Sequence, residues 1–228
     1  MRKWNVAMEM SSGDAAYPCA LRERGLSDRY PHIWAYGDLT LLSQPLLSFF
    51  CSAQCPGSLI LDAYDLAREL RDAAVPVISG FHSPIEKECF DLLVGGSQPV
   101  IVSPARGIAR MRVPSGWREH LEAGRLLILS TFAPENQTPR TALARRRNEF
   151  VAALSQECFV AHAAARSKTL DFCRQQLAAK KRILTIDRPE NEPLMNLGAD
   201  GLTVNQIVQR WSNPTPATEK RVSKQPQP

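Results

Sequence analysis

The stretch VISGFHSPIE at residues 77–86 carries a turn from a buried strand into a helix. The apolar run from Val75 to Ile78 predicts a strand, and the residues after it are typical of a tight turn. Ser83 can cap a helix, Pro84 suits the first helical position, and Glu86 stands where a capping box places its acid. The stretch therefore predicts strand, turn and helix, the repeating unit of an α/β fold.

The same unit recurs along most of the chain. Short apolar runs alternate with amphipathic stretches from residue 46 onward, a pattern typical of β-α units around a mostly parallel sheet. We expect about six strands, at residues 46–51, 75–78, 99–102, 126–129, 158–161 and 183–186. We expect helices at residues 59–74, 84–94, 115–123, from about 145 to 154, 167–179 and 204–211. The fold class is therefore α/β and Rossmann-like, with helices on both faces of the sheet.

Composition divides the chain into three parts. Residues 1–35 mix glycine, proline and charged residues with a few aromatics, which predicts an irregular N-terminal extension with at most short helices. Residues 36–211 form one Rossmann-like domain. Residues 212–228 are rich in Pro, Gln, Ser, Thr and Lys and bury too little apolar surface to offset their ordering entropy. We expect them to be a disordered, basic tail.

The overall composition is that of a globular protein with a modest positive charge. Hydrophobic residues make up 44% of the 228 residues and charged residues 22%. The sequence has no apolar run of about 20 residues and no secretory signal, so we expect a cytoplasmic protein without a membrane partner. The net charge of +5 permits a polyanionic partner. Basic residues gather at residues 140–147 and 174–182 and in the last ten residues.

The cysteines do not predict a metal site. Six are scattered along the chain, and Cys51 and Cys55 form the only close pair, with no second pair and no His-x₃-His to complete a zinc tetrahedron. We interpret all six as reduced thiols in or near the core, and we expect neither a metal nor a cofactor.

Five segments in a fixed order link the chain to a known family. They are YGDLTLL at 36–42, VISGFHSPIE at 77–86, LSTFAP at 129–134, RRNEFVAALS at 146–155 and AAARSKT at 163–169. In order and spacing they resemble segments of the DNA-processing protein A (Smf) family, over roughly residues 36–201. The resemblance implies a Rossmann-like domain that binds single-stranded DNA. It also implies a RecA-type recombinase as a partner and allows a homodimer.

The chain departs from the family pattern at three places. Cys51 stands where the family's first loop has glycine, and Ala53 stands where it has an arginine that faces the anionic ligand. Pro84 replaces a glycine of the second loop and removes a backbone N–H. Residues 202–228 leave no room for the family's C-terminal winged-helix module, so we expect a divergent relative with a single module.

The candidate site lies beyond the carboxyl ends of the strands, where open α/β sheets bind ligands. The start of the helix after residue 83 offers N–H groups and a positive dipole end to a phosphate. The arginines at 145–147, placed at the next helix start, are unfavourable there by about 0.3–1 kcal/mol each, which favours an anion beside them. Arginines also bind phosphate bidentately and stack on bases. We predict that the phosphate-binding residues are Ser79, Gly80, His82, Ser83, Arg145, Arg146, Arg147, Asn148 and Lys168.

No motif predicts a catalytic residue. The Gly-x-Gly-x-x-Gly loop of Rossmann dehydrogenases and the Gly-x₄-Gly-Lys-Ser/Thr loop of P-loop NTPases are both absent. Two alternatives to a DNA-binding protein stay open. The changes at Ala53 and Pro84 also fit a sensor of a nucleotide-derived ligand. Glu86 and Glu88 leave a carboxylate for a nucleotide N-glycosidic hydrolase, although that family's Pro-Gly-Gly-x-Gly-Thr-x-x-Glu loop is missing.

Overall fold

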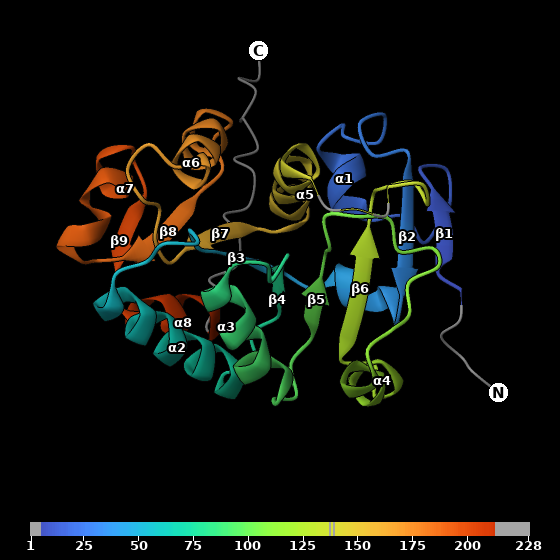
Figure 1. Ribbon diagram of the computed structural model, residues 1–228, viewed down its shortest axis with the longest axis horizontal. Helices are drawn as coiled ribbons and strands as arrows, with labels where there is room; N and C mark the ends of the chain where they lie inside the picture. Colours follow the sequence, from blue (N-terminus) through green and yellow to red (C-terminus); the bar gives the residue numbers. More distant parts are fainter. Residues whose placement is uncertain (1–5, 137, 139, 213–228) are drawn as a thin grey trace, which may run out of the picture.

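The computed structural model describes residues 6–136, 138 and 140–212. In these residues nine strands form one sheet in the order β1-β2-β6-β5-β4-β3-β7-β8-β9 (Figure 1). The strands are β1 (Met8–Ser11), β2 (His32–Tyr36), β3 (Leu47–Phe50), β4 (Val77–Ser79), β5 (Val100–Val102), β6 (Leu126–Ser130), β7 (Glu157–Val160), β8 (Ile183–Ile186) and β9 (Asp200–Leu202). The seven strands β3 to β9 pair in parallel, whereas β2 pairs antiparallel with both β1 and β6. The predicted Rossmann-like α/β fold is confirmed, with nine strands instead of about six.

Helices cover both faces of the sheet. One face carries α2 (Gly57–Asp72), α3 (Pro84–Val94), α4 (Ser115–Glu122) and α8 (Val204–Ser212). The other face carries α1 (Cys19–Glu23), α5 (Thr141–Leu154), α6 (Lys168–Ala178) and α7 (Glu192–Asn196). Two 3₁₀ helices, η1 (Leu39–Ser43) and η2 (Pro189–Asn191), complete the described elements. No helix in the described part of the chain is both long and apolar enough to cross a bilayer.

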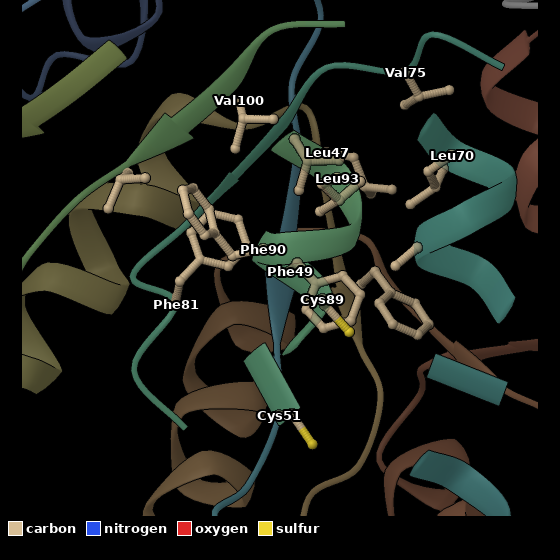
Figure 2. Packing of buried hydrophobic residues seen from close by; sticks show 14 of the residues in the cluster. Leu47, Phe49, Cys51, Leu70, Val75, Phe81, Cys89, Phe90, Leu93 and Val100 are labelled. Atoms are coloured by element: carbon tan, nitrogen blue, oxygen red, sulfur yellow. The ribbon is translucent and has the colours of Figure 1, made fainter. Parts of the chain in front are cut away.

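Two apolar clusters hold the layers together. Side chains alternate between the faces of a strand, so β3 sends Leu47 and Phe49 into one cluster and Phe50 into the other. Figure 2 shows the first cluster, in which Phe49 lies close to Cys89 and Leu93 of α3. Helix α2 buries an apolar stripe against the same face, formed by Leu59, Ala63, Leu66, Ala67 and Leu70. Both faces of the sheet are therefore packed by an apolar core.

The N-terminal segment differs from its expected irregular structure. Strands β1 and β2 extend the sheet beyond β6, and Tyr17 and Tyr30 are buried in the same apolar cluster as Phe150 of α5. The hydroxyl of Tyr17 donates a hydrogen bond to the carbonyl oxygen of Tyr30 at 2.7 Å. The prediction was wrong because β1 and β2 are short and pair with a strand distant in the sequence, which local patterns do not reveal. The expected tail lies outside the described residues, apart from Ser212, which ends α8.

The strand order creates a topological switch point next to β3. From β3 the chain proceeds outward through β4, β5 and β6, and it then returns to the other side of β3 as β7 (Figure 1). The loops after β3 and β7 therefore lead in opposite directions from neighbouring strand ends. Open α/β sheets bind ligands at such a point.

Candidate nucleic-acid interface

A groove of about 1310 Å³ lies at the switch point, lined mainly by α5 and α6. Ala53 from the loop after β3 and His82 from the loop after β4 contribute to its lining. Five cationic side chains line the groove, namely Arg29, Arg145, Arg146, Lys168 and Arg174. Only two carboxylates, Glu149 and Asp171, accompany them. The groove therefore has an excess of positive charge.

Ion pairs neutralise part of this charge. The Glu149 carboxylate pairs with the guanidinium groups of Arg29, at 2.5 Å, and Arg145, at 3.2 Å. The Arg174 guanidinium pairs with the Asp171 carboxylate at 2.7 Å. In the described part of the chain, Arg146 and Lys168 have no carboxylate partner, and both side chains are exposed. These two cations come from different helices, α5 and α6. They are the groove charges most available to an external anion.

The Glu86 carboxylate closes the turn between β4 and α3. Its Oε1 accepts the backbone N–H of Cys51 at 3.0 Å, and its Oε2 accepts those of His82 at 2.7 Å and Ser83 at 3.3 Å. The Ser83 hydroxyl accepts the Glu86 N–H, which completes the predicted capping box. The donors that would hold a phosphate at this helix start are therefore already paired with an internal anion.

Ser79 and Gly80 shape this turn from beneath. Ser79 is fully buried, and its hydroxyl donates to the carbonyl oxygen of Phe49 at 2.6 Å and accepts the N–H of Phe81 at 3.2 Å. Gly80 lies against the guanidinium of Arg147, where a Cβ would overlap the side chain. Ser79, Gly80 and Ser83 were predicted to contact phosphate. In the structure the hydroxyls of Ser79 and Ser83 are buried and already bonded, and none of the three residues lines the groove, so their contact with phosphate stays a prediction.

The position of the arginines in α5 also corrects the prediction. The helix begins at Thr141, so residues 145–147 lie in its second turn. The helix dipole acts mainly within the first turn. The argument that the dipole demands an anion beside these arginines was therefore wrong, and the helix start was misjudged because the polar stretch before it extends to Thr141. Arg145 and Arg146 lie on the exposed face of α5, whereas Arg147 lies on its buried face.

Arg147 is an internal link between α5 and the strand-end loops. Its side chain is almost fully buried, and its Nη1 donates to the carbonyl oxygen of Ser103 at 3.1 Å. Its Nε donates to Oδ1 of Asn148 at 2.7 Å. Burial lowers the pKa of Arg147, and the nearby negative charge of Glu86 opposes that shift. Arg147 therefore positions its neighbours and is not exposed to the groove.

Comparison with known proteins identifies the family. The family model for DNA recombination-mediator protein A matches residues 9–210. The chain belongs to this family. The match confirms the resemblance found in the sequence and extends it over β1 and β2.

Solved structures of two DNA processing A proteins and of a molybdenum cofactor binding protein share the fold. DNA processing protein A from Streptococcus pneumoniae is 21% identical with a TM-score of 0.73, covering 89% of this chain and 73% of its own. The Helicobacter pylori protein, solved to study its single-stranded DNA binding mode, is 18% identical with a TM-score of 0.67, covering 89% and 94%. The molybdenum cofactor binding protein of Rippkaea orientalis is 11% identical with a TM-score of 0.51, covering 73% and 94%. No curated protein matches the chain.

In this recombination-mediator protein the groove collects five of the nine predicted site residues, namely His82, Arg145, Arg146, Asn148 and Lys168. It also contains residues that the sequence did not single out. Arg29 belongs to the segment assigned to the N-terminal extension, and no local signal connects it to α5. Arg174 belongs to a basic cluster that is equally typical of a solvated helix face.

Ala53 is an uncharged residue of the groove lining. It is exposed and lines the groove at the position where the family pattern has arginine. The predicted loss of one anion contact therefore concerns a residue that the structure brings to the site. Arg146 and Lys168, the cations of the groove lining without a carboxylate partner among the described residues, come from the two helices instead.

Proposed function

We propose that the groove binds single-stranded DNA, with Arg146 and Lys168 as the principal phosphate contacts. Arg145, Asn148 and His82 lie along the same groove and supply further polar contacts. The observation that carries the proposal is the pair of exposed cations without carboxylate partners among the described residues, which two helices bring to one groove. Membership of the DNA recombination-mediator protein A family supports the same ligand.

Two features favour a polymer over a nucleotide-derived signal. The groove volume of about 1310 Å³ exceeds the range of about 300–1,000 Å³ for small-molecule sites. In addition, Glu86 already occupies the backbone donors at the start of α3 that would take a terminal phosphate. The Glu86 side chain is also buried, which favours binding over glycosidic hydrolysis at this carboxylate.

The groove also offers surfaces for bases. Ala142 and Ala144 of α5 and Thr169 of α6 give it small side chains between the cations. Phe172, the one Phe, Tyr or Trp among the lining residues described, is almost fully buried. Base stacking in this groove would therefore fall to arginine guanidinium planes, which serve that role in proteins that bind single strands without sequence preference.

Family membership supports further proposals about partners. We propose that a RecA-type recombinase receives the bound strand in the cytoplasm and that the protein acts as a homodimer. Light scattering during size-exclusion chromatography measures the mass in solution, and a monomer at every concentration would contradict the dimer. Co-elution with a RecA-type protein on single-stranded DNA tests the recombinase.

Fluorescence anisotropy tests the DNA ligand directly. The protein is titrated into labelled oligo-dT, into a duplex of equal length and into a labelled mononucleotide, each at two salt concentrations. We expect tightest binding to oligo-dT, an affinity that falls with salt, and stronger binding to longer strands. Binding of the mononucleotide without binding of oligo-dT would replace this proposal with the sensor.

A further inference from the structure

One carboxylate of the groove lining, that of Glu149, holds two arginines at once. Its Oε2 pairs with Nη2 of Arg29 at 2.5 Å, and its Oε1 pairs with Nε of Arg145 at 3.2 Å. Asp171, the other carboxylate among the described lining residues, pairs only with Arg174 in the described part of the chain. A single side chain therefore neutralises two of the five groove cations.

The two neutralised arginines lie next to the proposed phosphate contacts. Nη2 of Arg146 donates a hydrogen bond to the backbone carbonyl oxygen of Arg29 at 3.3 Å. Nη2 of Arg145 donates to Oε1 of Gln175 on α6 at 3.2 Å. All four residues line the same groove. A strand that contacts Arg146 therefore also passes the two ion pairs of Glu149.

The exposure of these side chains allows an external anion to reach the arginines. The exposed fraction is 53% for Arg29 and 66% for Arg145, but only 14% for Glu149. Each guanidinium group has five N–H donors, and Glu149 bonds to one nitrogen of each. Ion pairs of exposed arginines are weak because water screens them. A phosphate can therefore displace the carboxylate from either arginine.

The N-terminal segment is attached to α5 without the ion pair of Glu149. Nη2 of Arg24 donates to the carbonyl oxygen of Ser155 at 3.0 Å. The Tyr30 ring packs on the Phe150 ring, with the two centroids 5.0 Å apart. These two contacts come from either side, in the sequence, of the arginine that pairs with Glu149. The charge of Glu149 is therefore not required to hold the segment in place.

We propose that Glu149 regulates the groove as an internal competitor for phosphate. It holds Arg29 and Arg145 in reserve and repels phosphates nearby, so it lowers the affinity for single-stranded DNA and speeds release of the strand. The phosphates must displace the carboxylate before these two arginines contact them fully. This regulation rests on the proposed function, because it concerns the same groove and the same ligand.

E149Q tests the competition, because glutamine keeps the shape of the side chain and removes its charge. The full-length proteins are titrated into labelled oligo-dT at several salt concentrations. We expect the Kd of E149Q to be lower than that of the wild type by about threefold or more at low salt. The slope of log K against log salt should become steeper by up to about 1.4, for two additional phosphate contacts. Release of the labelled strand into excess unlabelled oligo-dT should be slower.

D65N is the matched control. It changes the net charge by the same amount as E149Q and frees Arg68 from an exposed pair on α2, outside the groove lining. Its Kd should stay near the wild-type value. A wild-type Kd for E149Q, or an equal gain in E149Q and D65N, would overturn the proposal.

A double-mutant cycle separates competition from a structural role. R29A should weaken binding about threefold more in the E149Q background than in the wild type, because the arginine is fully available to phosphate only when the carboxylate is gone. Equal losses in both backgrounds, or a melting temperature of E149Q far below the wild-type value, would show that the ion pairs are structural. Failure of the wild type and E149Q alike to bind oligo-dT at low salt would instead contradict the proposed function, and the regulation with it.

Discussion

Gly80 and Arg147 show how single residues set the geometry below the groove. The missing side chain of Gly80 leaves the space that the Arg147 guanidinium fills, and Arg147 in turn bonds to Ser103 and Asn148. The triplet at 145–147 is uniform in sequence, yet its members have different roles because α5 turns one of them inward. Residue type alone therefore did not reveal which arginines are available to DNA.

Gly80→Ala is expected to destabilise the protein. The new Cβ must displace the buried guanidinium of Arg147, and overpacking of this kind costs about 1–3 kcal/mol. Urea denaturation followed by circular dichroism measures the loss. The double variant G80A/R147A should be more stable than the sum of the two single losses predicts, because without the Arg147 guanidinium the new Cβ no longer clashes with it. Strict additivity would show that Gly80 and Arg147 do not interact.

Ala53→Arg is expected to strengthen binding to oligo-dT. Ala53 is exposed on the groove, so an arginine there adds a phosphate contact without disturbing the core. The slope of log K against log salt should become steeper by about 0.7 for one additional contact. Gln54→Arg, next along the same exposed loop and outside the groove lining, is the matched control. Equal gains in both variants would indicate a general charge effect and not a contact in the groove.

At the level of elements, regular apolar patterns were predictable and short edge elements were not. The strand at 183–186 and the capped helix after Ser83 agree with the sequence prediction, because their signals are local. Strands β1, β2 and β9 were missed because they are three to five residues long, and β2 joins the sheet through β6, a strand distant in the sequence. The role of Glu86 was equally hidden, since a sequence does not show which backbone groups a carboxylate will accept.

Helix α8 is held to the sheet by Glu157, and this contact gives an element-level prediction. Glu157 is buried on β7 and accepts Nε of Arg210 at 2.8 Å and Nε1 of Trp211 at 3.1 Å. Arg210→Ala should lower the free energy of unfolding by about 1–2 kcal/mol, because it removes charge-assisted bonds from a buried carboxylate. Arg68→Ala, which breaks the exposed pair with Asp65, is the control and should change stability by less than about 0.5 kcal/mol. Similar losses in both would contradict the docking role of Arg210.

The stability of the whole molecule should depend on pH through Lys181. Its side chain is buried, and desolvation lowers the pKa of Lys181 to about 8. The positive charge of Arg24 also lowers this pKa, whereas interactions with Cys158 and Glu157 raise it. Between pH 8 and 10.5 the unfolded chain therefore holds more protons at this site than the folded protein does. The contribution of Lys181 to stability must rise with pH across this window.

Lys181→Met isolates this contribution. The wild-type free energy of unfolding minus that of K181M should rise by about 2 kcal/mol from pH 8 to pH 10. Tyr30 and Cys173, whose pKa values burial raises, have the opposite dependence, but they are present in both proteins and cancel in the difference. A difference that stays flat or falls with pH would show that Lys181 is not desolvated in the folded protein.

At the scale of the whole molecule, we propose that the groove at the carboxyl ends of the strands binds single-stranded DNA through two exposed cations, Arg146 and Lys168. The most direct test is an oligo-dT anisotropy titration of R146A/K168A at several salt concentrations, with R118A on α4 at the opposite end of the sheet as the control (Figure 1). We predict a weaker affinity for R146A/K168A and a salt slope lower by about 1.4, which corresponds to two lost phosphate contacts. Its melting temperature should stay at the wild-type value, because both side chains are exposed. Wild-type binding by R146A/K168A, or an equal loss of affinity in R118A, would contradict the assignment of this groove to single-stranded DNA.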